Sequence, residues 1–292
     1  MNMRILIISA DNLGISIEQV PYQHFEYLKY PVLVGEKEYR ETETFTASWL
    51  LERFIKEKIT AKSSSLSRAE MTDLIEKNIN NYDLIIHIVM GSNMSAATFN
   101  IAEEVREKYK GKVNIINVDT RQVVGGVGVI LLRLIDIIKE NEKEEEIRNR
   151  ARELVVNTFS YYVTPDLNYL YRGGRIGKAK AFLGSVLRVL PVVGLMGDDP
   201  EGEVVPIGQE RTYKQANSLI INSIMEKMNE QKADKITVSI ISGDESNSEA
   251  INGLRQEFVS SVPVEKLVTG KLHLVEAIYM GPGGYGITVC MK

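Results

Sequence analysis

The sequence has few side chains that could bind a metal or form a disulfide. Cys290 is the one cysteine among 292 residues, which excludes an internal disulfide and a cysteine zinc site. The three histidines, His24, His87 and His273, lie too far apart in the sequence to form the paired metal ligands of a helix. We therefore expect no metal ion and no cofactor.

Long apolar runs and an excess of positive charge are also missing. No stretch of about 20 apolar residues occurs, which excludes a membrane-spanning helix. Residues 1–12 become polar too early for a signal peptide, so we expect a cytoplasmic protein. The formal net charge of −4 disfavours general binding to nucleic acids.

The sequence does contain alternating strand and helix patterns. Continuous apolar runs at 4–9, 83–89 and 113–118 predict strands buried on both faces, which is typical of a parallel sheet. Helical patterns separate these runs, as in βαβ units. We predict an α/β fold in which residues 1–157 form a parallel-sheet domain with flanking helices. Residues 158–292 form an α+β domain with a mixed sheet.

The second half has shorter apolar runs that are interrupted by glycine and proline. An apolar helix is expected over 178–190, and a basic turn with two arginines precedes it at 171–178. Strands are expected at 271–279 and 286–291, with the glycine-rich loop Met280-Gly-Pro-Gly-Gly between them. So many glycines indicate either a tight turn or backbone that closely approaches a ligand.

Two serine-rich segments are candidate anion sites. The segment 62–67 contains four serines, and either Ser67 begins a helix with Glu70 in a capping box or the hydroxyls hold an anion. Ser95 follows a predicted buried strand, where its hydroxyl and the next N–H groups can face the ligand crevice of a sheet. Because His87 lies within a strand, it cannot be assigned as a base for Ser95.

Other glycine-rich and basic segments allow two interpretations each. The helix start at 125–130 is an incomplete dinucleotide fingerprint, and its glycines favour close helix packing instead. The basic turn at 171–178 is either a solvated turn or an arginine fork that recognises phosphate or carboxylate.

These motifs together resemble the DegV family. The segment 167–191, with its Arg-Gly-Gly-Arg-Ile-Gly-Lys core, carries the most specific match, and the stretches 202–212 and 280–287 follow in the family's order. The resemblance implies a two-domain α/β protein that holds a long-chain fatty acid between its domains. Such a carrier has no catalytic residue of its own. It presents the acid to a separate ATP-dependent fatty-acid kinase, whose acyl phosphate enters phospholipid metabolism.

The resemblance also implies roles for individual residues. Ser63 and Ser95 occupy the positions of the family's head-group hydroxyls, and Tyr279 replaces the family's histidine before the glycine-rich loop. Arg175 and Arg211 match arginines of the kinase-facing surface. The full expected head-group set is Ser63, Ser64, Ser95, Ala96, Tyr279 and Gly281, and the expected tail contacts are Phe182, Leu183 and Val186.

Two other functions agree with the same residues. One is an enzyme that uses Ser95 as a nucleophile on an acylated or phosphorylated small molecule. The other is a degenerate family member that keeps the fold without the ligand, since the family's histidine is lost at Tyr279.

Overall fold

Four strands run parallel in the first sheet of this computed structural model, which describes residues 3–140, 143–184, 189–243 and 247–292. In spatial order the strands are β2 (Phe25–Leu28), β1 (Ile5–Ala10), β6 (Leu84–Val89) and β7 (Asn114–Asp119). The three apolar runs form β1, β6 and β7, as predicted. The edge strand β2 was not predicted, because its residues alternate in polarity and are only partly buried.

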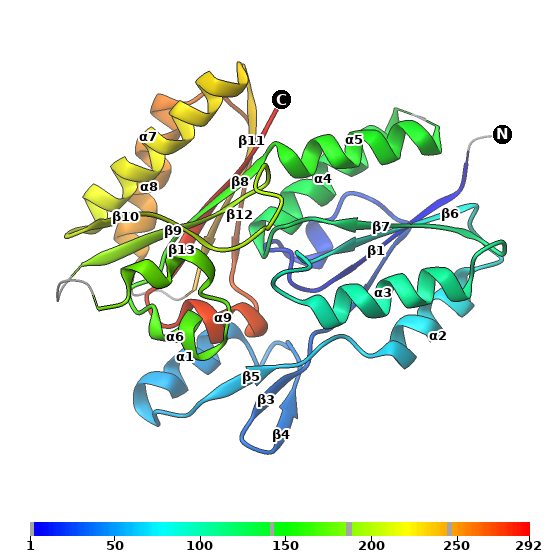
Figure 1. Cartoon of the computed structure of the whole chain (residues 1–292), viewed down its shortest axis with the longest axis horizontal. Helices are drawn as coiled ribbons and strands as arrows, with labels where there is room; N and C mark the ends of the chain where they lie inside the picture. Colours follow the sequence, from blue (N-terminus) through cyan, green and yellow to red (C-terminus); the bar gives the residue numbers. More distant parts are fainter. Residues whose placement is uncertain (1–2, 141–142, 185–188, 244–246) are drawn as a thin grey trace.

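Helices cover both faces of this sheet, so its strands are apolar on both sides (Figure 1). Ile7 and Ile86 pack with α4 (Gly125–Lys139) and α5 (Glu144–Val156). The alternate residues Leu6 and Ile85 pack on the other face, with α2 (Arg68–Asn78) and α3 (Ala96–Lys108). This alternation is the period-two pattern of a strand between two helix layers.

The glycines at the start of α4 serve close packing. A Cβ atom on Gly128 would lie 2.1 Å from the carbonyl oxygen of Leu13, and one on Gly125 would lie 2.7 Å from Ser239 Oγ. Nearly all of α4 is buried, because it contacts β6 of the first sheet and β8, β11 and β13 of the second. This confirms the prediction that the glycines at the start of the helix allow it to pack closely.

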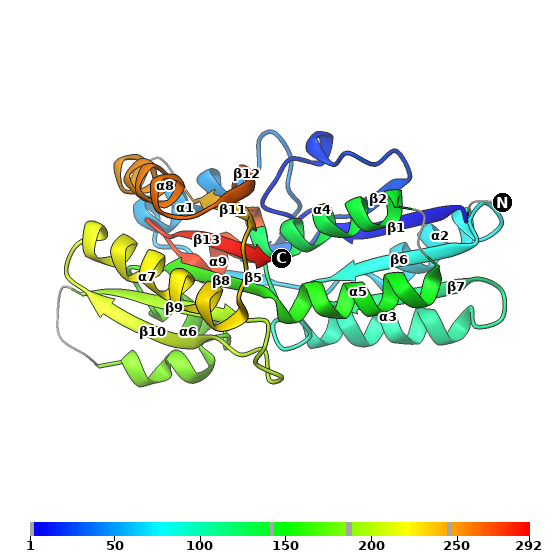
Figure 2. The same ribbon diagram turned by 90° about the horizontal axis from the view of Figure 1, so that it is seen from above.

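The second sheet is mixed and has six strands. In spatial order they are β10 (Val205–Glu210), β9 (Leu190–Met196), β8 (Thr158–Val163), β13 (Tyr285–Met291), β11 (Ile236–Ser242) and β12 (Val264–Lys271). β11 and β12 are parallel, and the other neighbours are antiparallel. Helices α7 (Tyr213–Gln231) and α8 (Ser248–Ser261) cover the outer face (Figure 2). The predicted α/β class with a parallel and a mixed sheet is confirmed.

A small antiparallel sheet adjoins the two large ones at the bottom of Figure 1. Its strands are β4 (Lys37–Tyr39), β3 (Val32–Val34) and β5 (Ala61–Ser63). Helices α1 (Ala47–Lys56), α6 (Asn168–Arg172) and α9 (Leu274–Met280) lie beside it, and α9 contacts α1, α6 and β5. A short 3-10 helix, η1 (Ile17–Gln19), completes the first half.

Two predicted elements were wrong. The expected strand at 271–279 is largely helix α9, which begins where the Leu274 N–H donates to Glu41 Oε2 at 2.5 Å. The described part of the expected helix at 178–190 is a 3-10 helix, η2 (Gly177–Phe182), and β9 begins at Leu190, while residues 185–188 lie outside the described residues. After η2, Leu183 is extended and Gly184 has a positive φ of 80°, which a right-handed helix does not contain.

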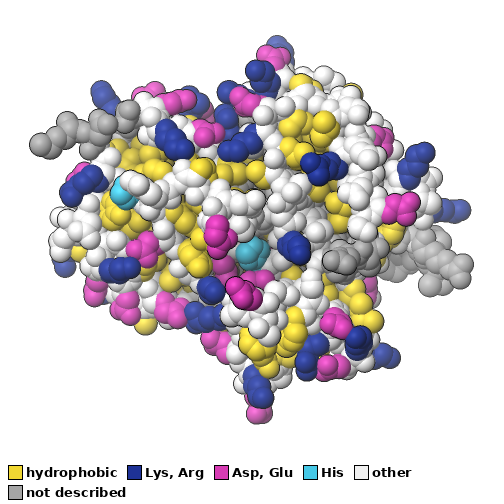
Figure 3. Space-filling model, turned by 180° about the vertical axis from the view of Figure 1, so that it is seen from behind, with side chains coloured by type: hydrophobic (Ala, Val, Ile, Leu, Met, Phe, Trp, Pro, Cys, Tyr) yellow, Lys and Arg dark blue, Asp and Glu magenta, His cyan; other side chains and the backbone are white. Residues whose placement is uncertain are grey.

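The described surface carries charges of both signs. On the face in Figure 3, acidic and basic side chains are intermixed, without a broad area of one sign. None of the described helices is long and apolar enough to cross a membrane.

Candidate functional site: an apolar cavity and its polar rim

Two adjoining cavities lie against α9 and β5, and the inner one also reaches the start of α3. The inner cavity measures about 70 Å³ and the outer one about 410 Å³. Ser63, Arg175 and Tyr279 line both of them. The outer volume falls within the range of roughly 300–1,000 Å³ that is usual for small-molecule sites, and the inner one is smaller.

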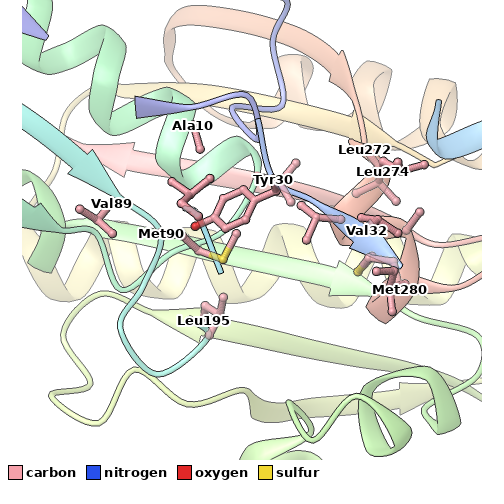
Figure 4. Packing of buried hydrophobic residues seen from close by; sticks show 14 of the residues in the cluster. Ala10, Tyr30, Val32, Val89, Met90, Leu195, Leu272, Leu274 and Met280 are labelled. Atoms are coloured by element: carbon pink, nitrogen blue, oxygen red, sulfur yellow. The ribbon is translucent and has the colours of Figure 1, made fainter. Parts of the chain in front are cut away.

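The inner cavity is mainly apolar. Figure 4 shows several of its residues: Met90 after β6, Leu195 on β9, Met280 on α9, and Tyr30 with its hydroxyl directed towards Met90. The remaining apolar and aromatic lining is Met94, Val123, Val124, Tyr162, Leu170, Val193, Val204 and Val275. An apolar ligand would therefore be largely removed from water here.

A hydrogen-bonded pair separates the two cavities. Ser63 Oγ on β5 and Tyr279 Oη on α9 are 2.5 Å apart, although 216 positions separate them in the sequence. The guanidinium of Arg175 lies 5.7 Å from the centre of the Tyr279 ring. Two hydroxyls and a cation therefore meet where the inner cavity opens.

Arg175 is held by backbone carbonyls. Its Nε donates to the Met94 oxygen at 3.1 Å, and its Nη1 donates to the Gly173 oxygen at 2.7 Å. Within the described chain no carboxylate forms an ion pair with Arg175. This half-buried guanidinium lines the cavity, and its positive charge can therefore interact with a bound anion.

The hydroxyl of Ser95 also faces the inner cavity. Ser95 precedes the first residue of α3, and its Oγ donates to Thr98 Oγ1 at 2.9 Å. Its own N–H donates to Gly91 O at 3.0 Å, so the amide of Ala96 is the first helical N–H that points out of the turn. The start of α3 therefore offers one hydroxyl and the positive end of a helix.

The other predicted head-group residues are arranged differently. Ser64 lines the inner cavity, and its N–H donates to Pro31 O at 3.0 Å. Ala96 and Gly281 are not among the residues that line either cavity. Gly281 instead ends α9 with φ 67°, and a Cβ atom there would lie 2.4 Å from the Tyr169 ring. The glycine-rich loop joins a helix to β13, not two strands as predicted.

The predicted tail residues do not surround the cavity. Phe182 is partly buried at the end of η2, and Leu183 is 37% exposed. Neither lines the two cavities, and Val186 lies outside the described residues. The reason is that η2 already ends at Phe182, with Leu183 extended, so the described part of the segment does not form the expected apolar helix. Arg211 is exposed just after β10.

The serine clusters are explained in part by helix starts. Ser67 begins α2 and accepts the Glu70 N–H at 3.3 Å, as predicted, while the Glu70 carboxylate pairs with Arg40. No histidine bonds to the Ser95 hydroxyl within the described chain. His87 is buried in β6, and burial lowers its pKa to about 4.

One acidic residue in the cavity wall was missed. Glu276 on α9 lines the inner cavity and is 4% exposed. Burial, together with the nearby charges of Asp11 and Glu41, raises its pKa to about 8. Burial likewise raises the pKa of Asp11 to about 6 and that of Glu41 to about 7. A lone acid in an apolar segment was the one available sequence signal, and it does not by itself indicate a cavity.

Comparison with known proteins identifies the family. A family model described as "Uncharacterised protein, DegV family" matches residues 5–292, and the chain belongs to this DegV family. Protein DegV of Bacillus subtilis is 23% identical over 291 residues, which cover 99% of this chain and 100% of that protein. A DegV domain-containing protein of Clostridium acetobutylicum is 24% identical over 292 residues, 99% of each chain.

Solved structures share the fold over the whole length. A DegV family protein from Thermus thermophilus, described by its fatty acid binding, has a TM-score of 0.89 at 25% identity, and the match covers 99% of this chain and 100% of that one. The Bacillus subtilis DegV structure, described as a fatty acid binding protein, has a TM-score of 0.84 at 24% identity with the same coverage.

Proposed function

We propose that this chain binds a long-chain fatty acid, with its carboxylate at the polar rim and its tail along the apolar lining of the inner cavity, whose side chains would move apart to admit it. The observation that carries the proposal is the apolar cavity that ends in the Ser63–Tyr279 pair beside Arg175, which has no carboxylate partner within the described chain. The Thermus thermophilus relative, described by its fatty acid binding, supports it. The tail would supply most of the affinity, since each buried CH₂ contributes about 0.8 kcal/mol.

The head group would be held without a metal ion. The Ser63 and Ser95 hydroxyls can donate to a carboxylate, and Tyr279 and Arg175 add a phenol and a fixed positive charge. Such charge-assisted hydrogen bonds are about twice as strong as neutral ones. Ser64 can contribute a further hydroxyl from the same strand end, while Ala96 begins α3 and Gly281 ends α9 without lining the cavity.

The finer role is that of a cytoplasmic carrier. In this proposal residues 1–157 and 158–292 form two domains that hold the ligand between them, and a partner kinase phosphorylates the exposed carboxylate with ATP for phospholipid metabolism. The chain itself would not be an enzyme. Arg211, exposed after β10, would then contact the kinase, together with the outer side of Arg175.

Mass spectrometry of organic extracts and a fatty-acid titration of the delipidated protein test the binding. We expect a stoichiometric fatty acid in the extract. The double variant Ser63→Ala/Ser95→Ala should bind hexadecanoic acid at least about tenfold more weakly, because hydrogen bonds to a charged group contribute about 1.5–3 kcal/mol each. The matched control is Ser260→Ala/Ser261→Ala, whose hydroxyls bond within α8.

Unchanged affinity in the double variant would contradict the assigned head-group site. A protein that takes up no fatty acid and whose Ser95 reacts with a serine probe would favour the enzyme instead. For the carrier role, an Arg211→Glu variant should lower the acyl phosphate formed with a fatty-acid kinase and leave the fatty-acid affinity unchanged. Equal product from both proteins would contradict the partner surface.

A further inference from the structure

The wall of the inner cavity contains a carboxyl group without a partner. Glu276 is 4% exposed, and neither of its oxygens accepts or donates a hydrogen bond within the described chain. Buried polar groups in proteins are almost always hydrogen-bonded, because an unpaired one loses its water without compensation. A fatty-acid chain offers CH₂ groups alone and would leave this carboxyl unpaired.

Within the described chain no basic group acts on the pKa of this carboxyl. The neighbouring acids Asp11 and Glu41 raise its pKa, and the side chain of Asn12 lowers it, although the Asn12 amide does not have the geometry of a formed hydrogen bond. Lys29, which lowers the pKa values of Asp11 and Glu41, donates to the Glu41 backbone oxygen at 2.8 Å instead. The open side of Glu276 is therefore the cavity, and its partner would come from there.

Glu276 also has a fixed place relative to the head-group site. It lies three residues before Tyr279 on α9, and residues at this spacing are neighbours on one face of a helix, about 5–6 Å apart at Cβ. Both side chains line the inner cavity. A ligand whose carboxylate reaches Tyr279 would thus pass Glu276 with the first few carbons of its chain.

We infer that the cavity selects a fatty acid that carries a hydroxyl group within a few carbons of its carboxylate, with Glu276 as the residue that binds this hydroxyl. The inference rests on the fatty-acid binding proposed above and specifies the ligand class. A hydroxyl both donates and accepts, so it pairs with the carboxyl in either protonation state. A carbonyl accepts alone, and an ammonium would place a second cation near Arg175.

Competition titrations on the delipidated protein test this selectivity. The probes are hexadecanoic acid and its 2-hydroxy and 3-hydroxy derivatives, each against a fluorescent fatty acid. We expect at least one hydroxy acid to bind the unmodified protein about tenfold more tightly than hexadecanoic acid, the factor expected for one additional hydrogen bond in a buried site. The Glu276→Leu variant should lose this preference and bind hexadecanoic acid at least as tightly as the hydroxy acid.

A Met280→Leu variant is the matched control, since Met280 lines the same cavity without a polar group, and it should keep the preference. Glu276→Met, which has a similar length and no N–H, O–H or carbonyl group, tests the same point if the leucine variant does not fold.

Each outcome is decisive. Binding of hexadecanoic acid that equals or exceeds both hydroxy acids would overturn the inference and leave the proposed function intact. A preference that survives in both Glu276 variants would overturn the assignment to this residue. Failure to bind any of the three acids would overturn the proposed function itself, and the inference with it.

Discussion

The buried Glu276 should make the ligand-free protein less stable as the pH rises. Its pKa is about 8 in the folded protein, against an ordinary value of 4.5. A carboxyl group whose folded pKa is the higher one binds its proton more tightly in the folded state. The folded state is therefore favoured below pH 4.5, and this advantage is lost as the pH rises towards 8 and above. Replacing Glu276 with glutamine removes the titration and retains the shape.

The size of the effect follows from the same values. Each pKa unit corresponds to about 1.36 kcal/mol. By linkage, the titration of Glu276 lowers the unfolding free energy by on the order of 3 kcal/mol at pH 7 and by less than about 1 kcal/mol at pH 5, relative to a side chain that does not titrate. Glu276→Gln should therefore be more stable than the unmodified protein at pH 7 by roughly this amount, with little difference at pH 5.

Urea unfolding of the delipidated proteins at several pH values measures this difference. Removal of lipid is essential, because a ligand that binds the folded state adds stability of its own. The matched control is Glu43→Gln, an exposed residue whose substitution should leave the pH profile unchanged. If Glu276→Gln and the unmodified protein lose stability in parallel between pH 5 and 8, the carboxyl is satisfied in solution and the reasoning is refuted.

Two further predictions concern the rim and the core. Arg175→Gln should weaken fatty-acid binding about tenfold, since Arg175 lines both cavities. The control Arg211→Gln should leave the affinity unchanged. If titration gives both variants the same affinity, Arg175 belongs to the partner surface alone. Gly128→Ala should lower the unfolding free energy by about 2–3 kcal/mol, because its Cβ would meet the backbone oxygen of Leu13. Gly253→Ala on α8, whose Cβ would meet nothing closer than Asn217 Nδ2 at 3.9 Å, should raise it by up to about 1 kcal/mol. Urea midpoints in the opposite order would contradict the packing argument.

Much of the fold follows from local patterns. The strands β1, β6 and β7 were predictable because burial on both faces leaves continuous apolar runs. The segment 271–279 was not, since a short apolar run fits a buried strand and a buried helix equally well. A contact with a residue distant in sequence favours the helix, because the Glu41 carboxylate accepts a hydrogen bond from the first N–H of α9.

The sequence predicted several residues that line the cavity at its polar rim, but not its apolar lining. Ser63 and Ser95 lie at the end of a strand and the start of a helix, and these positions can be recognised from spacing and resemblance. The lining comes as single residues from many elements, such as Met90, Leu195 and Val275, none of which differs from an ordinary core residue in the sequence. The tail prediction was made along one segment, whereas the cavity is assembled from segments far apart.

The position of β13 in the second sheet determines when this cavity can form during synthesis. β13 lies between β8 and β11, so without it the sheet would be divided into two separate parts, β10-β9-β8 and β11-β12. The preceding helix, α9, carries Glu276 and Tyr279 into the cavity wall. The parallel sheet formed by residues 5–119 can assemble while the ribosome is still translating, but the cavity cannot. A nascent chain therefore completes the cavity only after residue 291 has emerged. A truncation before β13 would leave an exposed apolar surface for chaperones and proteases.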